Sequence, residues 1–533
     1  MKARALCSVL ASATYLMMCG CDASQGTLHR HRDPGSLVVA EAADVISLDL
    51  ARATDGESIQ VGELLFEGLV GWKPGTTELE PQLATSWEVA PDGRTWTFHL
   101  RDHVAFHDGT PLDADAVAFS FERLLDPLHP YYVGDSGSYW RNLLQDVSSV
   151  TVVDPLTVQF HVAQPYSPLL GDLAKYPIVS PTAVKRWKDD FGSHPVGTGP
   201  YVLETWTPGE RLVARRFAGY WGARPGLERV VFLVVVDARQ RLIDLEAGSV
   251  DIATAILPDE TSFVELHPDL VLHTTPGNDV CYLAFNLTHP PFDDVRVRRA
   301  ANLAINKEPI VKLAYSGRAV PADGPLPPTS WGYHAPATTY PYDPAAARAL
   351  LAAAAADGTF DPDRTYLLYA MSTPRPYSPS PERVARFLQG AFAQVGLKTD
   401  LIVQPFAQHR TAIQRGDHDM ALFGWVGDTG DPDNFLYVLF DSENTHAGDA
   451  LDVAFYRSAD VDRMLDEAQV TSDDKERAQL YADIQDRIAS DAPWVPIAHS
   501  QLVVASRAEL EHVVLSPNGH PVFPLITRAE SHD

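Results

Sequence analysis

Short apolar runs alternate with amphipathic runs along the chain from Leu37 onward, and this alternation constrains the fold more than any other feature. Strands are expected over residues 37–40, 95–100, 156–162 and 229–236. The last of these is an almost continuous apolar run, which is typical of a strand buried on both faces. Helices are expected over residues 343–358, 381–395 and 473–488, and Ser380 followed by Pro381 is the expected N-cap and first residue of the second. Strands and helices mixed in this way predict an α/β fold.

The size and charge of the chain set further limits. With 533 residues and 45% hydrophobic content, the chain is long enough for two or three domains. Its formal net charge is −28. Such an acidic protein is poorly suited to binding nucleic acid, because phosphate contacts need lysine or arginine, and it is a poor match for an anionic membrane surface.

The N-terminal residues have the pattern of an export signal. Two basic residues precede a mostly apolar stretch over residues 5–18, which is too short to cross a bilayer and has the length of a signal-peptide core. The stretch ends at Gly20 and Cys21, and a small residue followed by cysteine resembles the cleavage site of bacterial lipoproteins. We therefore expect a signal peptide over residues 1–20, lipidation of Cys21 and a polar tether over residues 21–35. An ordinary signal peptide without lipidation is the alternative.

Cysteine usage fits an exported protein. Cleavage before Cys21 removes Cys7 and Cys19, which leaves Cys281 as the one free thiol candidate. No internal disulfide is expected from a single spare cysteine.

The stretch GWVGDTGDPDNF at residues 424–435 carries three aspartates and no lysine or arginine. Asp428 lies just past the carboxyl end of an expected apolar strand, where α/β sheets place their ligands. A carboxylate in a partly dry cleft is costly unless a cation neutralises it, so a cationic group of a ligand is a candidate partner. Gly424 and Gly427 are expected to leave room for the backbone of that ligand, and Trp425 to form an apolar wall.

Other interpretations of this stretch stay open on the residues alone. Asp428 is equally well explained as the cap of a turn, a common role of aspartate in glycine-rich loops. A calcium loop of the EF-hand type has aspartates at positions 1, 3 and 5, whereas Asp428, Asp431 and Asp433 fall at relative positions 1, 4 and 6. No metal site is therefore expected.

The segment GDSGS at residues 134–138 resembles the nucleophile loop of serine proteases, and it is the sole support for an exported hydrolase. No GxSxG, HExxH or Walker A motif accompanies it. An ordinary loop is expected here, and the chain is not expected to be an enzyme.

Several long segments are similar to one protein family. They are PQLATSWEVAPDGRTWTFHLRDHVAFHDGTPLDADAVAFSFERL (81–124), PVGTGPYVLETWTPGERLVARRFAGYWG (195–222), YLAFNLTHPPFDDVRVRRAANLAINKEPIV (282–311) and RAQLYADIQDRIASDAPWVPIAHS (477–500). On these segments the chain resembles the bacterial periplasmic oligopeptide- and dipeptide-binding proteins of ABC importers, the family 5 solute-binding proteins.

The resemblance implies a two-lobe periplasmic-binding-protein fold, type II-like, with an extra subdomain in the first lobe and the ligand enclosed between the lobes. The implied boundaries are lobe I over residues 36–278 with an inserted subdomain at about 66–184, lobe II over residues 279–496, and a return to lobe I over residues 497–533. The two segments that cross between the lobes are expected near residues 275–284 and 493–503.

The resemblance also implies a ligand site, and the stretch at residues 424–435 is most similar to the dipeptide-binding branch of the family. In that branch the aspartate matching Asp428 holds the peptide ammonium group, and the arginine matching Arg375 holds the carboxylate. Phe406 stands where the branch usually has tryptophan, and Trp425 and Gly427 complete the expected ligand-binding set. Because Phe406 departs from the pattern, the preference for ligand side chains is left open.

The implied function is capture of short, dipeptide-like peptides and their delivery to an ABC permease, by a monomer without cofactor, metal or nucleic-acid partner. The implied location is the periplasm, at the outer face of the cytoplasmic membrane. The same scaffold is used for other cargo, so haem, glutathione, a nickel chelate and a cationic antimicrobial peptide remain alternatives.

Overall fold

The structure is a computed structural model and describes residues 33, 35–53, 55–174 and 176–529. The expected signal peptide, Cys21 and almost all of the tether lie outside these residues. All that follows concerns the described residues from Gly35 onward.

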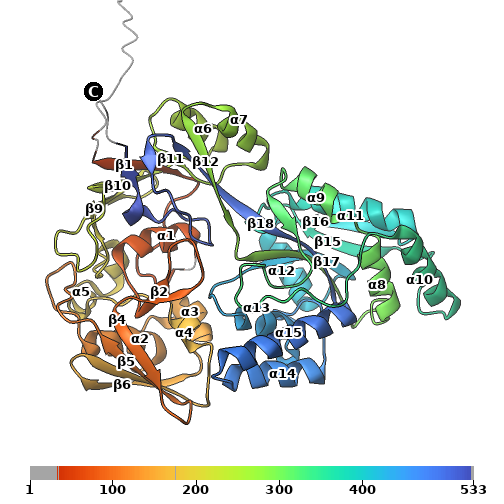
Figure 1. Cartoon of the computed structure of the whole chain (residues 1–533), viewed down its shortest axis with the longest axis horizontal. Helices are drawn as coiled ribbons and strands as arrows, with labels where there is room; N and C mark the ends of the chain where they lie inside the picture. Colours follow the sequence, from red (N-terminus) through yellow and green to blue (C-terminus); the bar gives the residue numbers. More distant parts are fainter. Residues whose placement is uncertain (1–32, 34, 54, 175, 530–533) are drawn as a thin grey trace, which may run out of the picture. The chain divides into compact units, whose positions relative to one another are not determined.

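One strand, β18 (Trp494–Arg507), joins two groups of strands into a single sheet (Figure 1). Its first half pairs with β13 (Asp279–Phe285), and its second half pairs with β12 (Leu270–Pro276) and β11 (Ile252–Ala253). We call the elements grouped with β12 lobe I and those grouped with β13 lobe II. The chain passes between the lobes from β12 to β13 and again along β18, which are the places where the crossing segments were expected.

Lobe I contains the other strands of its half of the sheet and the helices beside them. The strands are β1 (Ser36–Glu41), β8 (Tyr201–Thr207), β9 (Arg211–Arg216) and β10 (Arg229–Val234), and a small C-terminal pair is formed by β19 (Leu510–Glu511) and β20 (Thr527–Arg528). The helices are α1 (Gly56–Leu65), α5 (Pro181–Trp187), α6 (Ala238–Glu246) and α7 (Thr261–Leu266). The expectation that β10 is buried on both faces is wrong. Only Val230 and Phe232 are buried. Both edges of the strand are paired, but the side chains on its other face remain partly exposed.

A separate antiparallel sheet of order β4-β5-β7-β6 belongs to lobe I and forms its lower part in Figure 1. Its strands are β4 (Ala84–Val89), β5 (Thr95–Leu100), β6 (Val147–Asp154) and β7 (Thr157–Val162). Around them lie β2 (Val70–Trp72), β3 (Leu79–Pro81), α2 (Ala114–Leu125), α3 (Ser138–Leu143) and α4 (Leu169–Leu173). The ring of Phe160 contacts those of Phe98 and Phe121 at centroid distances of 5.4 and 4.7 Å, which joins the sheet to α2 in one aromatic core.

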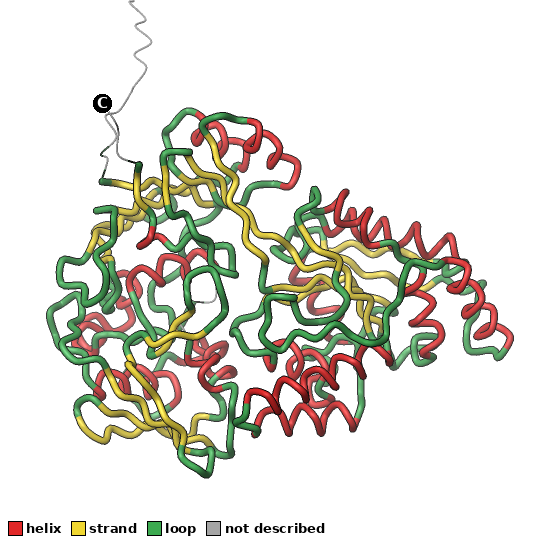
Figure 2. Tube along the Cα trace, viewed as in Figure 1, coloured by secondary structure: helices red, strands yellow, loops and turns green. Residues whose placement is uncertain are grey.

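Lobe II is a layered α/β unit. Its strands are β13, β14 (Ala319–Pro321), β15 (Tyr366–Met371), β16 (Thr399–Gln404) and β17 (Met420–Val426). Its helices are α8 (Val295–Leu303), α9 (Lys307–Ala314), α10 (Pro344–Ala356), α11 (Pro381–Val395), α12 (Phe406–Arg415), α13 (Asp433–Phe440), α14 (Ala459–Val470) and α15 (Asp474–Asp491). Figure 2 shows these helices flanking the strands. Strand β15 lies parallel to β16 and β17, whereas β17 lies antiparallel to β13.

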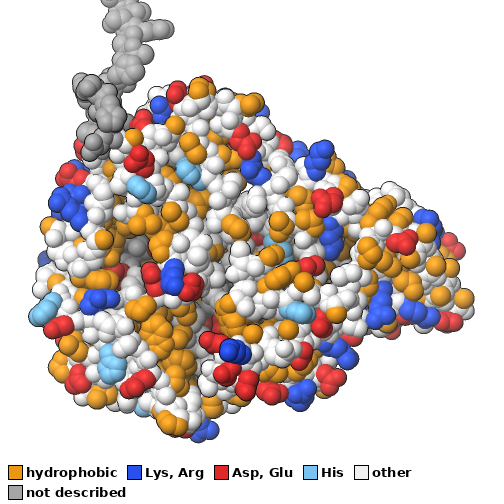
Figure 3. Space-filling model, in the orientation of Figure 1, with side chains coloured by type: hydrophobic (Ala, Val, Ile, Leu, Met, Phe, Trp, Pro, Cys, Tyr) orange, Lys and Arg blue, Asp and Glu red, His pale blue; other side chains and the backbone are white. Residues whose placement is uncertain are grey.

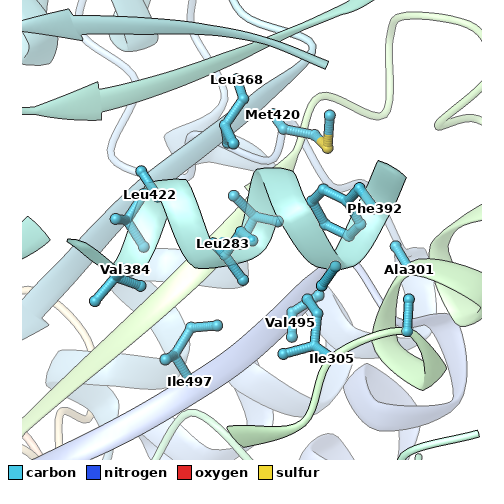
Figure 4. Close-up of a cluster of buried hydrophobic side chains, with 14 of the residues drawn as sticks. Leu283, Ala301, Ile305, Leu368, Val384, Phe392, Met420, Leu422, Val495 and Ile497 are labelled. Carbon is cyan, nitrogen blue, oxygen red and sulfur yellow. The ribbon is translucent and has the colours of Figure 1, made fainter. Parts of the chain in front are cut away.

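The main core of lobe II lies between α11 and the sheet (Figure 4). Val384, Leu388 and Phe392 recur at helical spacing on α11 and are fully buried. They contact the buried faces of β13, β15, β17 and β18, including Leu283, Leu368, Met420, Leu422, Val495 and Ile497. Ser380 and Pro381 occupy the expected N-cap and first helical positions, although the side chain of Ser380 makes no capping hydrogen bond.

Candidate functional site

The aspartate-rich stretch connects β17 to α13, and its backbone is tied to the crossing between β12 and β13. Gly427 N donates to the carbonyl of Asn278 at 2.7 Å. In return, Asn278 Nδ2 donates to the carbonyls of Gly427 and Thr429 at 3.1 and 3.2 Å. The turn after β17 is therefore held by the segment that joins the two lobes.

The Asp428 side chain lies near those of Tyr139 and Asn434. The Asn434 side chain is fixed in place, because its Oδ1 accepts from Asp428 N at 2.9 Å and from Trp425 Nε1 at 3.2 Å. Burial raises the pKa of Asp428 to about 6, although its polar neighbours Tyr139 and Asn434 lower it. Among the described residues, no basic side chain forms an ion pair with this carboxylate.

Tyr139 comes from lobe I and Asp428 from lobe II, and both line one cavity of about 280 Å³. Trp72, Trp140 and Tyr220 are among its other walls. Gly75, Thr76 and Pro517 also border a larger cleft, so the two spaces adjoin each other.

The larger cleft has a volume of about 1280 Å³ and is lined by both lobes. Lobe I contributes Trp87, Trp96 and Tyr166, and lobe II contributes Trp331 and the Asp431–Arg477 pair. Figure 3 shows hydrophobic side chains gathered beside a hollow between the lobes. The space therefore combines aromatic walls with acidic groups.

The lobes also touch directly at the edge of this cleft. Ser167 N donates to the carbonyl of Gln469 at 2.7 Å, and Ser167 Oγ donates to the carbonyl of Thr471 at 2.6 Å. A Cβ atom at Gly171 would lie 3.3 Å from Cβ of Asp431. The structure is therefore a form in which the lobes are in contact around the site.

The other two aspartates of the stretch have partners inside the protein. Asp431 forms an ion pair of 2.9 Å with Arg477, a residue distant in sequence. Asp433 accepts a hydrogen bond of 3.3 Å from Gln469, and burial, assisted by the charge of Asp431, raises its pKa to about 8. Asp172 on α4 of lobe I has a raised pKa as well, because it is buried and the charge of Asp433 opposes its ionisation. These carboxyl groups support the turn and the contact between lobes.

Gly424 and Gly427 were expected to leave room for the backbone of a ligand. This expectation is wrong, because side chains of the protein itself occupy the space beside both glycines. A Cβ atom at Gly424 would overlap the ring of Tyr377, and one at Gly427 would overlap the side chains of Asn278 and Phe435. The protein's own packing therefore explains both glycines. A contact between the Gly427 backbone and a ligand stays a prediction.

Arg375 and Phe406 lie together on lobe II. The guanidinium carbon of Arg375 lies 4.1 Å from the centroid of the Phe406 ring, a cation–π contact. Phe406 stacks on Phe423 at 6.3 Å, and Phe423 and Trp425 occupy alternate positions on the same face of β17. Arg375 Nε is buried without a hydrogen-bond partner, and no acidic group among the described residues forms an ion pair with this guanidinium.

The structure therefore places Trp425 and Asp428 at the carboxyl end of β17, and Arg375 with Phe406 beside Phe423 of the same strand. Sequence reasoning missed Tyr139 and Asn434. Asn434 belongs to the same aspartate-rich stretch, where an amide beside carboxylates is a usable signal. Tyr139 directly follows GDSGS, but no local pattern connects it with a residue so far along the chain.

Two lobes joined by crossing strands, with a cleft lined by residues of both, are the architecture of a solute-binding protein. The model of the bacterial extracellular solute-binding proteins, family 5, matches residues 78–447, and the chain belongs to this family of ABC-importer components. The two-lobe α/β fold expected from the sequence is confirmed, and so is the expectation that the chain is not an enzyme.

Similar proteins cover nearly the whole chain. The dipeptide-binding protein of Escherichia coli (strain K12) is 35% identical over 86% of this chain and 88% of its own length. Heme-binding protein A of Haemophilus influenzae is 33% identical over 96% and 97% of the two chains. The periplasmic binding protein DppA from Helicobacter pylori, solved with the peptide STSA, is 32% identical, has a TM-score of 0.77, and aligns over 92% of this chain and 98% of its own. In the described part of the chain, no helix has the length and apolar character needed to cross a membrane.

Proposed function

We propose that the protein captures short peptides with a free amino terminus and passes them to an ABC permease. The observation that carries the proposal is the Asp428 carboxylate, which faces a cavity between the lobes without a basic partner among the described residues. A peptide ammonium group supplies that missing charge. Dipeptide-binding relatives at 35% and 31% identity support this choice of cargo.

Arg375 is proposed to hold the other end of the peptide. Its guanidinium offers a planar fork of donors that matches a carboxylate. Stacking on Phe406 fixes the plane of the fork without using its donors. An acid and a base held on one rigid lobe set the separation of the two charged ends, and a fixed separation favours peptides of a particular length.

Enclosure of the peptide follows from the contacts between the lobes. Ser167 of lobe I donates hydrogen bonds to the carbonyls of Gln469 and Thr471 of lobe II, and hinge closure is how periplasmic binding proteins trap their ligands. The lobe boundaries at residues 36–278, 279–496 and 497–533, with the inserted subdomain at about 66–184, form part of this proposal.

The proposed location is the periplasm, at the outer face of the cytoplasmic membrane. Export by the segment at residues 1–20 and lipidation of Cys21 keep a monomer close to its permease. The support comes from the sequence pattern at Gly20 and Cys21 alone.

Haem is the second candidate cargo, and one observation favours it. The cleft of about 1280 Å³ exceeds the roughly 300–1,000 Å³ of ordinary small-molecule pockets, and several tryptophans line it. Against haem, the described residues that line this cleft include no histidine, methionine or cysteine to ligate iron, although Tyr166 is among them. The larger space equally accommodates a tripeptide or a longer peptide.

Calorimetric titration with a dipeptide and with its N-acetylated form, together with an absorbance titration of haemin, distinguishes these cargoes. We expect the dipeptide to bind, the acetylated form to bind at least tenfold more weakly, and haemin to give no saturable change in its Soret band. Equal binding of the two peptides refutes recognition of the ammonium group. A stoichiometric Soret shift moves the assignment to haem.

A further inference from the structure

We propose that a further cavity, which lies entirely within lobe II, binds the anion of a small carboxylic acid and that Lys307 holds the charge of this ligand. The cavity has a volume of about 330 Å³. Its described lining residues all come from lobe II, and none of them borders the two spaces between the lobes. The site is therefore separate from the one proposed for peptides, and its walls do not depend on contact between the lobes.

The walls of the cavity are held by the fold of lobe II. The lining runs from the start of α9 through β14 and residues 338–342 to the end of α15 and the start of β18. Tyr340 Oη donates to the carbonyl of Ala489 at 2.8 Å, and Asn302 Nδ2 donates to the carbonyl of Trp494 at 2.9 Å. Prolines, whose rings fix φ, supply further walls: Pro321, Pro325, Pro341, Pro493 and Pro496. Fixed walls lower the entropic cost of binding a ligand.

Lys307 places a positive charge on the wall of this cavity. It is the first residue of α9 and is half-buried. Its Nζ donates to the carbonyl of Ala322 at 2.6 Å, and both residues line the cavity. An ammonium group has three N–H donors, so two remain for a ligand. Among the residues that the structure describes, no carboxylate forms an ion pair with Lys307.

The protein balances the charge of Lys307 only weakly. Burial lowers the pKa of Lys307 to about 8, although the charge of Asp323 raises it, so the amine is largely protonated at neutral pH. Asp323 and Glu308 line the cavity but are exposed, where solvent and salt screen their charges. Asp323 also accepts a hydrogen bond of 2.9 Å from Tyr333. The ammonium group is therefore partly desolvated without a close counter-ion, and an anion that enters the cavity relieves that cost.

The other walls select the class of anion. Ile305, Ala322 and Ile488 are buried and give the cavity an apolar lining. Asn306 also lines it, and its side chain makes no capping hydrogen bond to α9. At about 30 Å³ per water molecule in the liquid, the volume corresponds to roughly ten non-hydrogen atoms. One cationic group, one amide and apolar walls match a monocarboxylate with a compact apolar body. A phosphate, which carries more charge and no apolar surface, matches this lining poorly.

Ligand-observed saturation-transfer NMR with benzoate tests the site, and benzyl alcohol and benzylamine serve as neutral and cationic probes of similar shape. We expect benzoate to bind saturably and the other two probes to bind about tenfold more weakly or less. Lys307→Met should weaken benzoate binding by about tenfold or more, because it removes a charge-assisted hydrogen bond. Lys312→Met is the matched control, since Lys312 is exposed on the same helix, and it should bind benzoate as the wild type does.

Arg375→Met shows which site holds the anion, because Arg375 is the other cationic group proposed to bind a carboxylate. Benzoate binding that survives in Arg375→Met and is lost in Lys307→Met supports the site in lobe II. The site is refuted if benzoate does not bind saturably, if the three probes bind alike, if Arg375→Met loses the binding, or if Lys307→Met retains it. If Lys307→Met does not fold, Lys307→Gln is measured in its place, since it removes the same charge. Because the test needs no peptide, failure of the proposed function leaves its result unaffected.

Discussion

Replacing Asp428 with asparagine is expected to weaken peptide binding while stabilising the protein without ligand. Asparagine keeps the size of the side chain, but it removes the charge. Leaving the peptide ammonium group without its buried partner costs about 2–5 kcal/mol. At about 1.4 kcal/mol per tenfold change, the dissociation constant rises by roughly 30- to 4000-fold.

The effect on stability has the opposite sign, because Asp428 is buried without a basic partner among the described residues. Its pKa rises from 3.8 to about 6, so the stability it contributes at low pH is lost as the pH rises toward 6. At about 1.4 kcal/mol per pKa unit, this loss is at most about 3 kcal/mol, and partial exposure to the cavity reduces it to about 1–3 kcal/mol. Asparagine does not titrate, so Asp428→Asn avoids the loss at neutral pH.

Thermal unfolding without ligand and calorimetric titration with a dipeptide, both at pH 7.5, measure the two effects on one sample. We expect Asp428→Asn to melt a few degrees above the wild type and to lose its advantage below about pH 4. Asp431→Asn is a useful comparison, since it removes the ion pair of the buried Arg477 and should destabilise the protein. An Asp428→Asn variant that melts at a lower temperature than the wild type and binds peptide normally refutes the reasoning. In that case Asp428 is a structural cap of the turn.

Three further changes test other parts of the molecule. Arg375→Met should weaken dipeptide binding by roughly 30- to 4000-fold through the lost carboxylate partner, whereas the exposed Arg386→Met should leave it unchanged; equal affinity of both variants removes Arg375 from the site. Asp433→Asn should flatten the fall in melting temperature between pH 5 and 8, because the raised pKa of about 8 means that the native state keeps a proton which the unfolded chain gives up; an unchanged slope contradicts this. Cys21→Ser should move the protein from the membrane fraction to the soluble fraction, and a wild type that is itself soluble with an unmodified Cys21 excludes the anchor.

The sequence predicted the features that depend on residues close together in the chain. Strand β5 has the expected bounds of residues 95–100, because apolar and polar residues alternate there and a tight turn precedes it. Helix α15 was expected over residues 473–488 and runs from Asp474 to Asp491, where the carboxylate of Asp473 accepts from Lys475 N and Glu476 N. The position of Asp428 just past the end of β17 followed from the apolar run before it.

Contacts between segments that are far apart in the sequence could not be predicted in this way. The aspartate-rich stretch looks free of basic partners, yet Arg477 from α15 neutralises Asp431. The small size of Gly424 suggested space for a ligand, whereas Tyr377 from another loop takes that space. The presence of Tyr139 and Asp428 in the walls of one cavity depends on how the two lobes meet. Packing between elements decides each of these cases, and no local spacing in the sequence encodes it.

The shared strand β18 determines the mechanics of any opening of the lobes. Because β18 is hydrogen-bonded to β12 at one end and to β13 at the other, the lobes are joined by a continuous ribbon and not by a free swivel. Separation of the lobes must bend this strand, whose pairing with β13 is irregular between Cys281 and Tyr282. Any opening of the lobes is therefore limited to movements that a strand paired at both ends can follow.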